Sequence, residues 1–169
     1  VFDDYATSPN ALLVPSTLVF ISHTGPGRFR MNTKQTGDTS EAAVIAELIG
    51  RGYTVSIPFG DNDPYDLVVD SAESLHRVQV KTGWIEDGCL RFKTGSKTTE
   101  DGSTRVTDYS PEDVDAFAIR CRDTETLYWV PIAIAGKKNT YLRIDPAQIE
   151  HPNITRAEGF LFDAALPDV

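Results

Sequence analysis

Between residues 38 and 52, hydrophobic positions recur with the period of a helix. Four apolar side chains lie three or four positions apart on one face, which predicts an amphipathic helix; they are Val44, Ile45, Leu48 and Ile49. Asp38 is the expected N-cap, and Glu41 then falls at the third helical position, which is the spacing of a capping box. Gly50 and Gly52 follow the last apolar position and are expected to end this helix.

Past this helix, the period changes to the alternation that is typical of β-strands. Residues 53–57 form one expected strand. Residues 66–70 and 75–82 form an expected hairpin around a polar turn at 71–74. Residues 89–94 alternate between apolar and basic side chains, which predicts a strand with one face on the core.

The second half of the chain adds further strands. Residues 115–121 are apolar at nearly every position, which is typical of a central strand buried on both faces, and residues 127–134 predict one more strand. Residues 95–104 are rich in Gly, Ser and Thr and are expected to form a hairpin tip or loop. Asp145 and Pro146 are expected to begin a short terminal helix. This order predicts one α/β core rather than a repeating βαβ array.

Composition is that of an ordinary globular protein, since 40% of the 169 residues are hydrophobic and 24% are charged. No apolar run reaches the length of a membrane span, so no membrane partner is expected. Two cysteines are too few for a disulfide framework or a zinc site, and a reducing, cytoplasmic setting is expected. Residues 1–30 lack a clear period and Met31 is the only methionine. We therefore expect an N-terminal extension at 1–30, preceding the natural start or left by processing, and a single domain at 31–169.

The net charge of −9 limits the partners that the surface can attract. An acidic surface keeps a protein soluble and repels a polyanion, and this composition resembles that of halophilic proteins. Nucleic-acid binding therefore requires a local basic patch. Four residues around the expected hairpin are candidates for phosphate contacts, namely Arg91, Lys93, Lys97 and Arg105. The same loop carries Glu100 and Asp101, so an ordinary solvated hairpin is the alternative.

Polar side chains interrupt the expected hairpin at 66–82. Gln79 and Lys81 share one face of their strand, because residues two apart point the same way, while Val80 points into the core. An antiparallel neighbour can bring Asp66 beside them. The Asp66 carboxylate, the Gln79 amide oxygen and the Val80 carbonyl are hard oxygen ligands that suit Mg²⁺ or Mn²⁺. Lys81 cannot bind such a cation, but it can orient a water nucleophile or neutralise a phosphate. These residue types suit phosphodiester hydrolysis.

This set of residues resembles the PD-(D/E)XK nuclease superfamily. Pro64-Tyr65-Asp66 is similar to the first half of that motif, and Gln79-Val80-Lys81 to the second half. The resemblance covers about residues 34–134 and points to the archaeal Holliday-junction-resolvase-like branch and the related homing endonucleases. It implies a restriction-endonuclease-like αβββαβ core, in which helices flank a mixed central sheet.

The resemblance also implies roles for these residues. Asp66 would be the central metal ligand, Glu41 an auxiliary acidic ligand and Lys81 the catalytic lysine. Gln79 stands where the family usually has an acid, and the loss of one negative charge should lower metal affinity. The substrate would be duplex or branched DNA, and a homodimer would supply one site for each strand.

Other interpretations stay open at this point. The capping box alone would explain Glu41, and Tyr109 would either stack on a base or be structural. A protein of the same fold that has lost its metal affinity would bind DNA or a protein partner without cutting. Cleavage of RNA at the same site is a third hypothesis.

Overall fold

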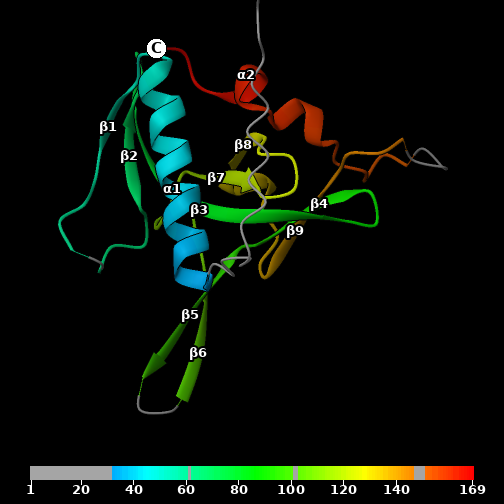
Figure 1. Cartoon of the computed structure of the whole chain (residues 1–169), viewed down its shortest axis with the longest axis horizontal. Helices are drawn as coiled ribbons and strands as arrows, with labels where there is room; N and C mark the ends of the chain where they lie inside the picture. Colours follow the sequence, from blue (N-terminus) through cyan, green and yellow to red (C-terminus); the bar gives the residue numbers. More distant parts are fainter. Residues whose placement is uncertain (1–31, 61, 101–102, 147–150) are drawn as a thin grey trace, which may run out of the picture. The chain divides into compact units, whose positions relative to one another are not determined.

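The computed structural model describes residues 32–60, 62–100, 103–146 and 151–169, which all belong to one compact unit, Met31–Val169. The extension expected at 1–30 lies outside the described residues. Figure 1 shows the helices and strands. In chain order they are α1 (Thr33–Gly50), β1 (Thr54–Ser56), β2 (Leu67–Asp70), β3 (Leu75–Glu86), β4 (Cys89–Lys93), β5 (Gly95–Glu100), β6 (Ser103–Asp108), β7 (Ala116–Cys121), β8 (Leu127–Pro131), the 3₁₀ turn Ile132–Ile134, β9 (Asn139–Arg143), the 3₁₀ turn Ala157–Phe160 and α2 (Phe162–Ala165).

Seven strands form one mixed sheet, which confirms the expected α/β class. β1, β2 and β3 are antiparallel neighbours, β3 runs parallel to β7, and β8 pairs with β7 in the antiparallel sense. The last residues of β3 pair with β4, which in turn pairs with β9. β5 and β6 form a separate two-stranded sheet that extends away from the other strands in Figure 1. β3 is therefore the strand that pairs with β2, β4 and β7 and links the parts of the sheet.

The helix α1 begins earlier than its apolar stripe predicts. Asn32 is the N-cap, and its side chain accepts the Gln35 N–H at 2.8 Å, while the Gln35 side chain accepts the Asn32 N–H at 2.9 Å. The expected cap at Asp38 is therefore wrong, because this residue lies inside the helix. Glu41 is likewise in mid-helix, so no capping box explains it. The helix ends at Gly50, as expected.

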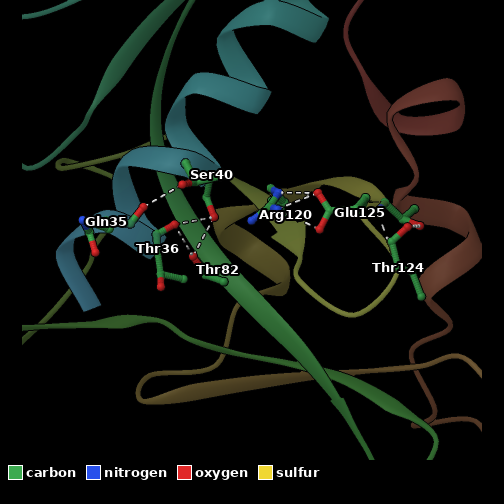
Figure 2. A network of polar contacts seen from close by, with 9 residues as sticks. Gln35, Thr36, Ser40, Thr82, Arg120, Thr124 and Glu125 are labelled. Carbon is green, nitrogen blue, oxygen red and sulfur yellow. Dashed lines mark hydrogen bonds and ion pairs between the residues drawn. The ribbon is translucent and has the colours of Figure 1, made fainter. Parts of the chain in front are cut away.

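Hydroxyl groups join the first half of α1 to the sheet, and this explains why hydrophobicity does not mark that half. Ser40 is fully buried. Its hydroxyl lies 2.7 Å from the Thr82 hydroxyl of β3 and donates to the Thr36 carbonyl at 3.1 Å (Figure 2). On β7, Arg120 is the register partner of Thr82. The side chain of Arg120 is 9% exposed and is neutralised by Glu125.

Two hydrophobic clusters lie on opposite faces of the strands. The cluster under α1 joins the helix to β2, β3, β7 and β8, and its members include Val44, Leu48, Leu67, Val78, Val80 and Trp129. The second cluster joins β4 and β9 to the other face of β7 and β8, and its members include Leu90, Phe92, Phe117, Ile119, Val130 and Leu142. β4 and β9 therefore supply apolar cover where α1 does not reach.

Gly83 is required at the point where β4 approaches β3 and β7. A Cβ atom at Gly83 would lie 2.8 Å from Leu90 Cδ1 and 2.9 Å from Ile119 Cγ2. Atoms of non-bonded side chains do not approach so closely in a packed core. Only glycine fits this position without displacing its neighbours.

The remaining predictions mostly hold, with four differences. The expected strand at 127–134 ends at Pro131, and the expected tip at 95–104 forms β5 and the start of β6. The αβββαβ order implies a helix between β3 and β7, but the described part of that connection consists of strands and turns. Asp145 and Pro146 are not helical, and the four residues that follow lie outside the described part of the chain. None of the described helices is long and apolar enough to cross a membrane.

Candidate active site

Asp66 lies directly before β2 and reaches across to β3. Its backbone N–H donates to the Val78 carbonyl at 2.9 Å. Its carboxylate oxygen Oδ2 accepts the Val80 N–H at 2.8 Å and also accepts the side-chain amide of Gln79. The antiparallel pairing of β2 with β3 thus brings the predicted Asp66, Gln79 and Val80 together.

The alternation of β3 sorts these residues onto two faces. Val80 belongs to the cluster under α1. Gln79 lies on the other face, opposite Phe117 of β7 in the parallel register, and only 8% of its surface is exposed. The N–H and C=O of a strand residue point to the same side of the strand. Because the Val80 N–H points at Asp66, the Val80 carbonyl also points to the side on which Asp66 lies.

Lys81 shares the face of Gln79 and meets Tyr109, which directly follows β6. Lys81 Nζ donates to the Tyr109 hydroxyl at 3.2 Å and lies 5.0 Å from the centre of its ring. The hydroxyl in turn donates to Gln79 Oε1 at 3.0 Å. A chain of hydrogen bonds therefore runs from the Lys81 ammonium through Tyr109 and Gln79 to the Asp66 carboxylate. Such chains strengthen each member by polarisation.

The pKa of Glu41 on α1 is affected by the charge of Asp66. Burial raises the pKa of the Glu41 carboxyl, and the negative charges of Asp66 and then Asp38 raise it further. Burial also raises the pKa of Asp66, although the hydrogen bond from the Val80 N–H and the charge of Lys81 oppose this rise. Both carboxyl groups are thus less easily ionised than usual. A cation near them would favour their charged forms.

The oxygen ligands of this site suit a hard divalent cation, although few of them carry a negative charge. Within the described ranges, no group of three or more His, Cys, Asp or Glu side chains could hold a metal ion. A cation here would therefore rely on Asp66, the Val80 carbonyl and the amide oxygen of Gln79, with Glu41 nearby. These are ligands that Mg²⁺ and Mn²⁺ accept. The amide of Gln79 turns its nitrogen rather than its oxygen to Asp66, so it would have to turn over to serve as a ligand.

The predicted phosphate contacts are not gathered into one described patch. Arg91 pairs with Glu86 at 2.9 Å and with Asp87 at 2.5 Å, and its guanidinium lies 5.1 Å from the centre of the Tyr141 ring. Its charge is thus satisfied within its own hairpin. Lys93 at the end of β4 is exposed. The other two candidates, Lys97 on β5 and Arg105 on β6, have side chains outside the described part of the structure.

Tyr109 is the site residue whose contacts the sequence does not reveal. It lies 28 positions from Lys81 and 30 from Gln79, on the connection between β3 and β7. A tyrosine after a polar strand and before a turn carries no local signal of this contact. Only the path of that connection brings its hydroxyl to β3.

Comparison with known proteins agrees with this geometry. Residues 31–163 match the family described as PD-(D/E)XK endonuclease. Among solved structures, the chain is similar to a bacterial homing endonuclease, I-Ssp6803I, with 25% sequence identity over 79% of this chain and 90% of that chain, and with a TM-score of 0.64. No curated protein matches the chain.

These matches confirm the predicted superfamily, fold and nuclease activity. The homing endonuclease shares the fold over most of both chains, and members of the matched family generally use divalent metal ions. The family match extends over the strands and the helix that bring Asp66, Gln79 and Lys81 together. The protein is an endonuclease that belongs to the PD-(D/E)XK family.

Proposed function

We propose that this endonuclease hydrolyses phosphodiester bonds of DNA with the help of Mg²⁺ or Mn²⁺. The observation that carries the proposal is the hydrogen-bonded group of Asp66, Gln79 and Val80, with Lys81 on the same strand. Asp66, the Val80 carbonyl and Gln79 Oε1 would hold the cation, and Glu41 would add negative charge. When bound, such a cation supplies positive charge to the phosphate as negative charge develops during hydrolysis.

Lys81 is the residue of this chain that would act on the phosphate or on the attacking water. Its ammonium is held by the Tyr109 hydroxyl at 3.2 Å, which uses one of its three N–H donors. The other donors are available to orient a water molecule or to offset charge on a phosphate oxygen. A donor that is fixed before the reaction costs no reorganisation when charge develops, and this accounts for much of enzymatic rate enhancement.

The sheet formed by β5 and β6 would contact the DNA. A two-stranded ribbon fits the major groove, and it carries Lys97 on β5 and Arg105 on β6. Each phosphate contact that is removed should reduce the slope of log K against log salt concentration by about 0.9. Replacement of both residues by alanine is therefore expected to flatten that slope by about 1.8, as measured by fluorescence anisotropy with labelled duplex DNA.

A homodimer would allow both strands of a duplex to be cut, because each copy supplies one site. Analytical ultracentrifugation with and without DNA tests this part of the proposal. A monomer that nicks one strand would contradict it.

A second candidate function has one observation in its favour. The Gln79 amide nitrogen donates to the Asp66 oxygen that would otherwise face a cation. A protein that kept this contact permanently would bind DNA without cutting it. Such a binding module would retain its DNA affinity in the presence of a chelator.

A cleavage assay decides between these functions. The wild type and Lys81→Met are incubated with duplex, branched and single-stranded DNA and with RNA, in Mg²⁺ or Mn²⁺ and over a salt series. Methionine keeps the apolar stem of the lysine and removes its charge. We expect metal-dependent cutting of DNA by the wild type and a rate at least about a hundredfold lower in the variant.

The matched control is Lys137→Met, since Lys137 is an exposed lysine remote from β3 in sequence. It should cut at the wild-type rate. Absence of cutting by a folded wild-type protein on every substrate, together with DNA affinity in EDTA, would favour the binding module. Preferential cutting of RNA would replace DNA as the substrate class.

A further inference from the structure

The side-chain amide of Gln79 is held at both of its ends. Its nitrogen Nε2 donates to the Asp66 carboxylate, and its oxygen Oε1 accepts the Tyr109 hydroxyl at 3.0 Å. The residue is 8% exposed, so neither end of the amide has ready access to water. A buried amide that loses one of these partners is left with an unsatisfied polar group.

A divalent cation at Asp66 would reverse the requirements on this amide. The cation binds oxygen and not the NH₂ group, so the amide must turn about its last bond and exchange the places of Oε1 and Nε2. The NH₂ group then needs a hydrogen-bond acceptor where the oxygen was. Lys81 has only donors, whereas the hydroxyl of Tyr109 both donates and accepts. Among the contacts of Gln79, this hydroxyl is therefore suited to both orientations.

The structure holds the Tyr109 ring firmly in place. The ring packs edge-on against Phe117, with 5.4 Å between the ring centres and 85° between the planes. The turn that follows is closed by Asp113, whose carboxylate accepts the Ser110 N–H at 2.9 Å and the Ser110 hydroxyl at 2.8 Å. These contacts position the Tyr109 hydroxyl toward β3.

Arg77 ties that segment to β3, two residues before Gln79. Its guanidinium donates to both carboxylate oxygens of Asp115, at 2.9 and 3.1 Å, and to the Pro111 carbonyl at 2.8 Å. The Asp115 carboxylate also accepts the Arg77 backbone N–H at 2.8 Å. The strand that carries Gln79 is therefore hydrogen-bonded to the turn that follows Tyr109.

We propose that Tyr109 is a positioning residue whose hydroxyl holds the Gln79 amide in both orientations, the one seen here and the turned one that presents Oε1 to a divalent cation at Asp66. The same hydroxyl keeps Lys81 beside the amide, since its oxygen accepts the lysine N–H in either case. This inference rests on the proposed use of a cation at Asp66. It assigns to Tyr109 a contribution to cation binding that is separate from any contact with DNA.

Tyr109→Phe isolates the hydroxyl. The ring, its contact with Phe117 and its position beneath Lys81 Nζ are retained, because phenylalanine also attracts cations to its face. The measurement is Mn²⁺ binding to the full chain by calorimetry. We expect about a tenfold weaker affinity in Tyr109→Phe, because the two orientations lose unequally. In the orientation seen here, the Lys81 ammonium could replace the hydroxyl as a donor to Oε1, whereas the turned amide would leave a buried N–H without an acceptor.

The same substitution in a Gln79→Glu background separates positioning from packing. A carboxylate presents oxygen at both ends and needs no turn, so Tyr109→Phe should then change the affinity by less than about twofold. The matched control is Tyr128→Phe, which removes another tyrosine hydroxyl from the second hydrophobic cluster and should leave Mn²⁺ affinity unchanged.

Three results would overturn the proposal. They are an unchanged affinity in Tyr109→Phe, an equal loss in the wild-type and Gln79→Glu backgrounds, and a wild type that binds no Mn²⁺. Cleavage rates of the same variants distinguish this failure from that of the proposed function. DNA cutting with no effect of Tyr109→Phe on cutting or on Mn²⁺ binding contradicts only the role of Tyr109. Mn²⁺ binding that depends on Tyr109, without any cutting, contradicts only the proposed hydrolysis.

Discussion

Neighbouring residues of β3 meet two different environments. Val80 faces α1 and packs in the cluster with Val44 and Leu48, whereas Gln79 faces Tyr109 and is hydrogen-bonded to Asp66. Both residues are 8% exposed, so burial alone does not distinguish the two faces. The difference lies in the polar partners. A period of two therefore lets one strand hold the helix with one set of residues and build a polar site with the other.

The two faces of β3 are therefore expected to contribute to different properties, one to stability and the other to chemistry. Substitutions on the α1 face should change the free energy of unfolding and leave the chemistry of each folded molecule intact. Substitutions at Gln79 and Lys81 should do the reverse. The second face changes from polar to apolar along the strand, because Gly83 lies two residues beyond Lys81 and packs against Leu90.

The largest expected loss of stability on the α1 face is that of Leu48→Ala. Leu48 is fully buried in the cluster under α1. Its truncation should reduce the free energy of unfolding by about 2–5 kcal/mol, as measured by urea denaturation. The cleavage rate for each folded molecule should stay at the wild-type value. A rate that falls further than the folded fraction would break the separation of the two faces.

Gly83→Ala should have an intermediate effect on stability. Gly83 lies where the polar part of the second face ends and packing against β4 begins. The added methyl group would lie 2.8 Å from Leu90 Cδ1 and 2.9 Å from Ile119 Cγ2, so its neighbours must shift. We expect a loss of about 1–3 kcal/mol in urea denaturation.

The matched control for Gly83→Ala is Gly37→Ala inside α1, where a Cβ atom would have nothing within 4 Å. That substitution should stabilise the protein by about 0.5–1 kcal/mol, because alanine is the better helix former. If both variants were equally stable, the close packing of β4 on β3 would not be as tight as the structure indicates.

The smallest expected effect is a pH-dependent gain of stability in Asp66→Asn, measured in EDTA. Burial raises the pKa of Asp66 above its ordinary value of 3.8, so the folded protein binds this proton more tightly than the unfolded chain does. The ionised carboxylate is therefore unfavourable in the folded state above the raised pKa, and this penalty disappears below about 3.8. Asparagine removes the charge and can still accept the Val80 N–H.

Asp66→Asn should thus be more stable than the wild type near neutral pH, and the difference should vanish as the pH falls below 3.8. Urea denaturation at a series of pH values between 3 and 8 measures this difference. A variant that is less stable than the wild type at neutral pH would show that the hydrogen bonds to the carboxylate outweigh its burial.

The parts of this molecule that could be predicted from sequence are those with local signals. The apolar stripe predicts α1, and the polar turn predicts the connection between β2 and β3, because each signal lies in the segment that it describes. The shared face of Gln79 and Lys81 follows directly from strand geometry. The two halves of the motif lie together because the strands that carry them form a hairpin.

The parts that could not be predicted depend on distant partners. The packing of the first half of α1 depends on Ser40, whose hydroxyl contacts that of Thr82, 42 positions away in the sequence, although the capping box that starts the helix is local. The contact of Tyr109 with Gln79 depends on the path between β3 and β7, where strands and turns stand in place of the expected helix. Neither the hydrophobic pattern nor the capping residues of one segment contain that information.

The most direct test of the polar face of β3 is Mn²⁺ binding to the wild type and to Asp66→Asn, measured by calorimetry at neutral pH. We expect saturable binding to the wild type and an affinity at least about a hundredfold lower in the variant, since a charged ligand is replaced by a neutral one. The variant should remain folded, so a loss of binding would belong to the site. Equal affinities in the two proteins would show that the cation does not bind at Asp66 and would contradict the proposed site.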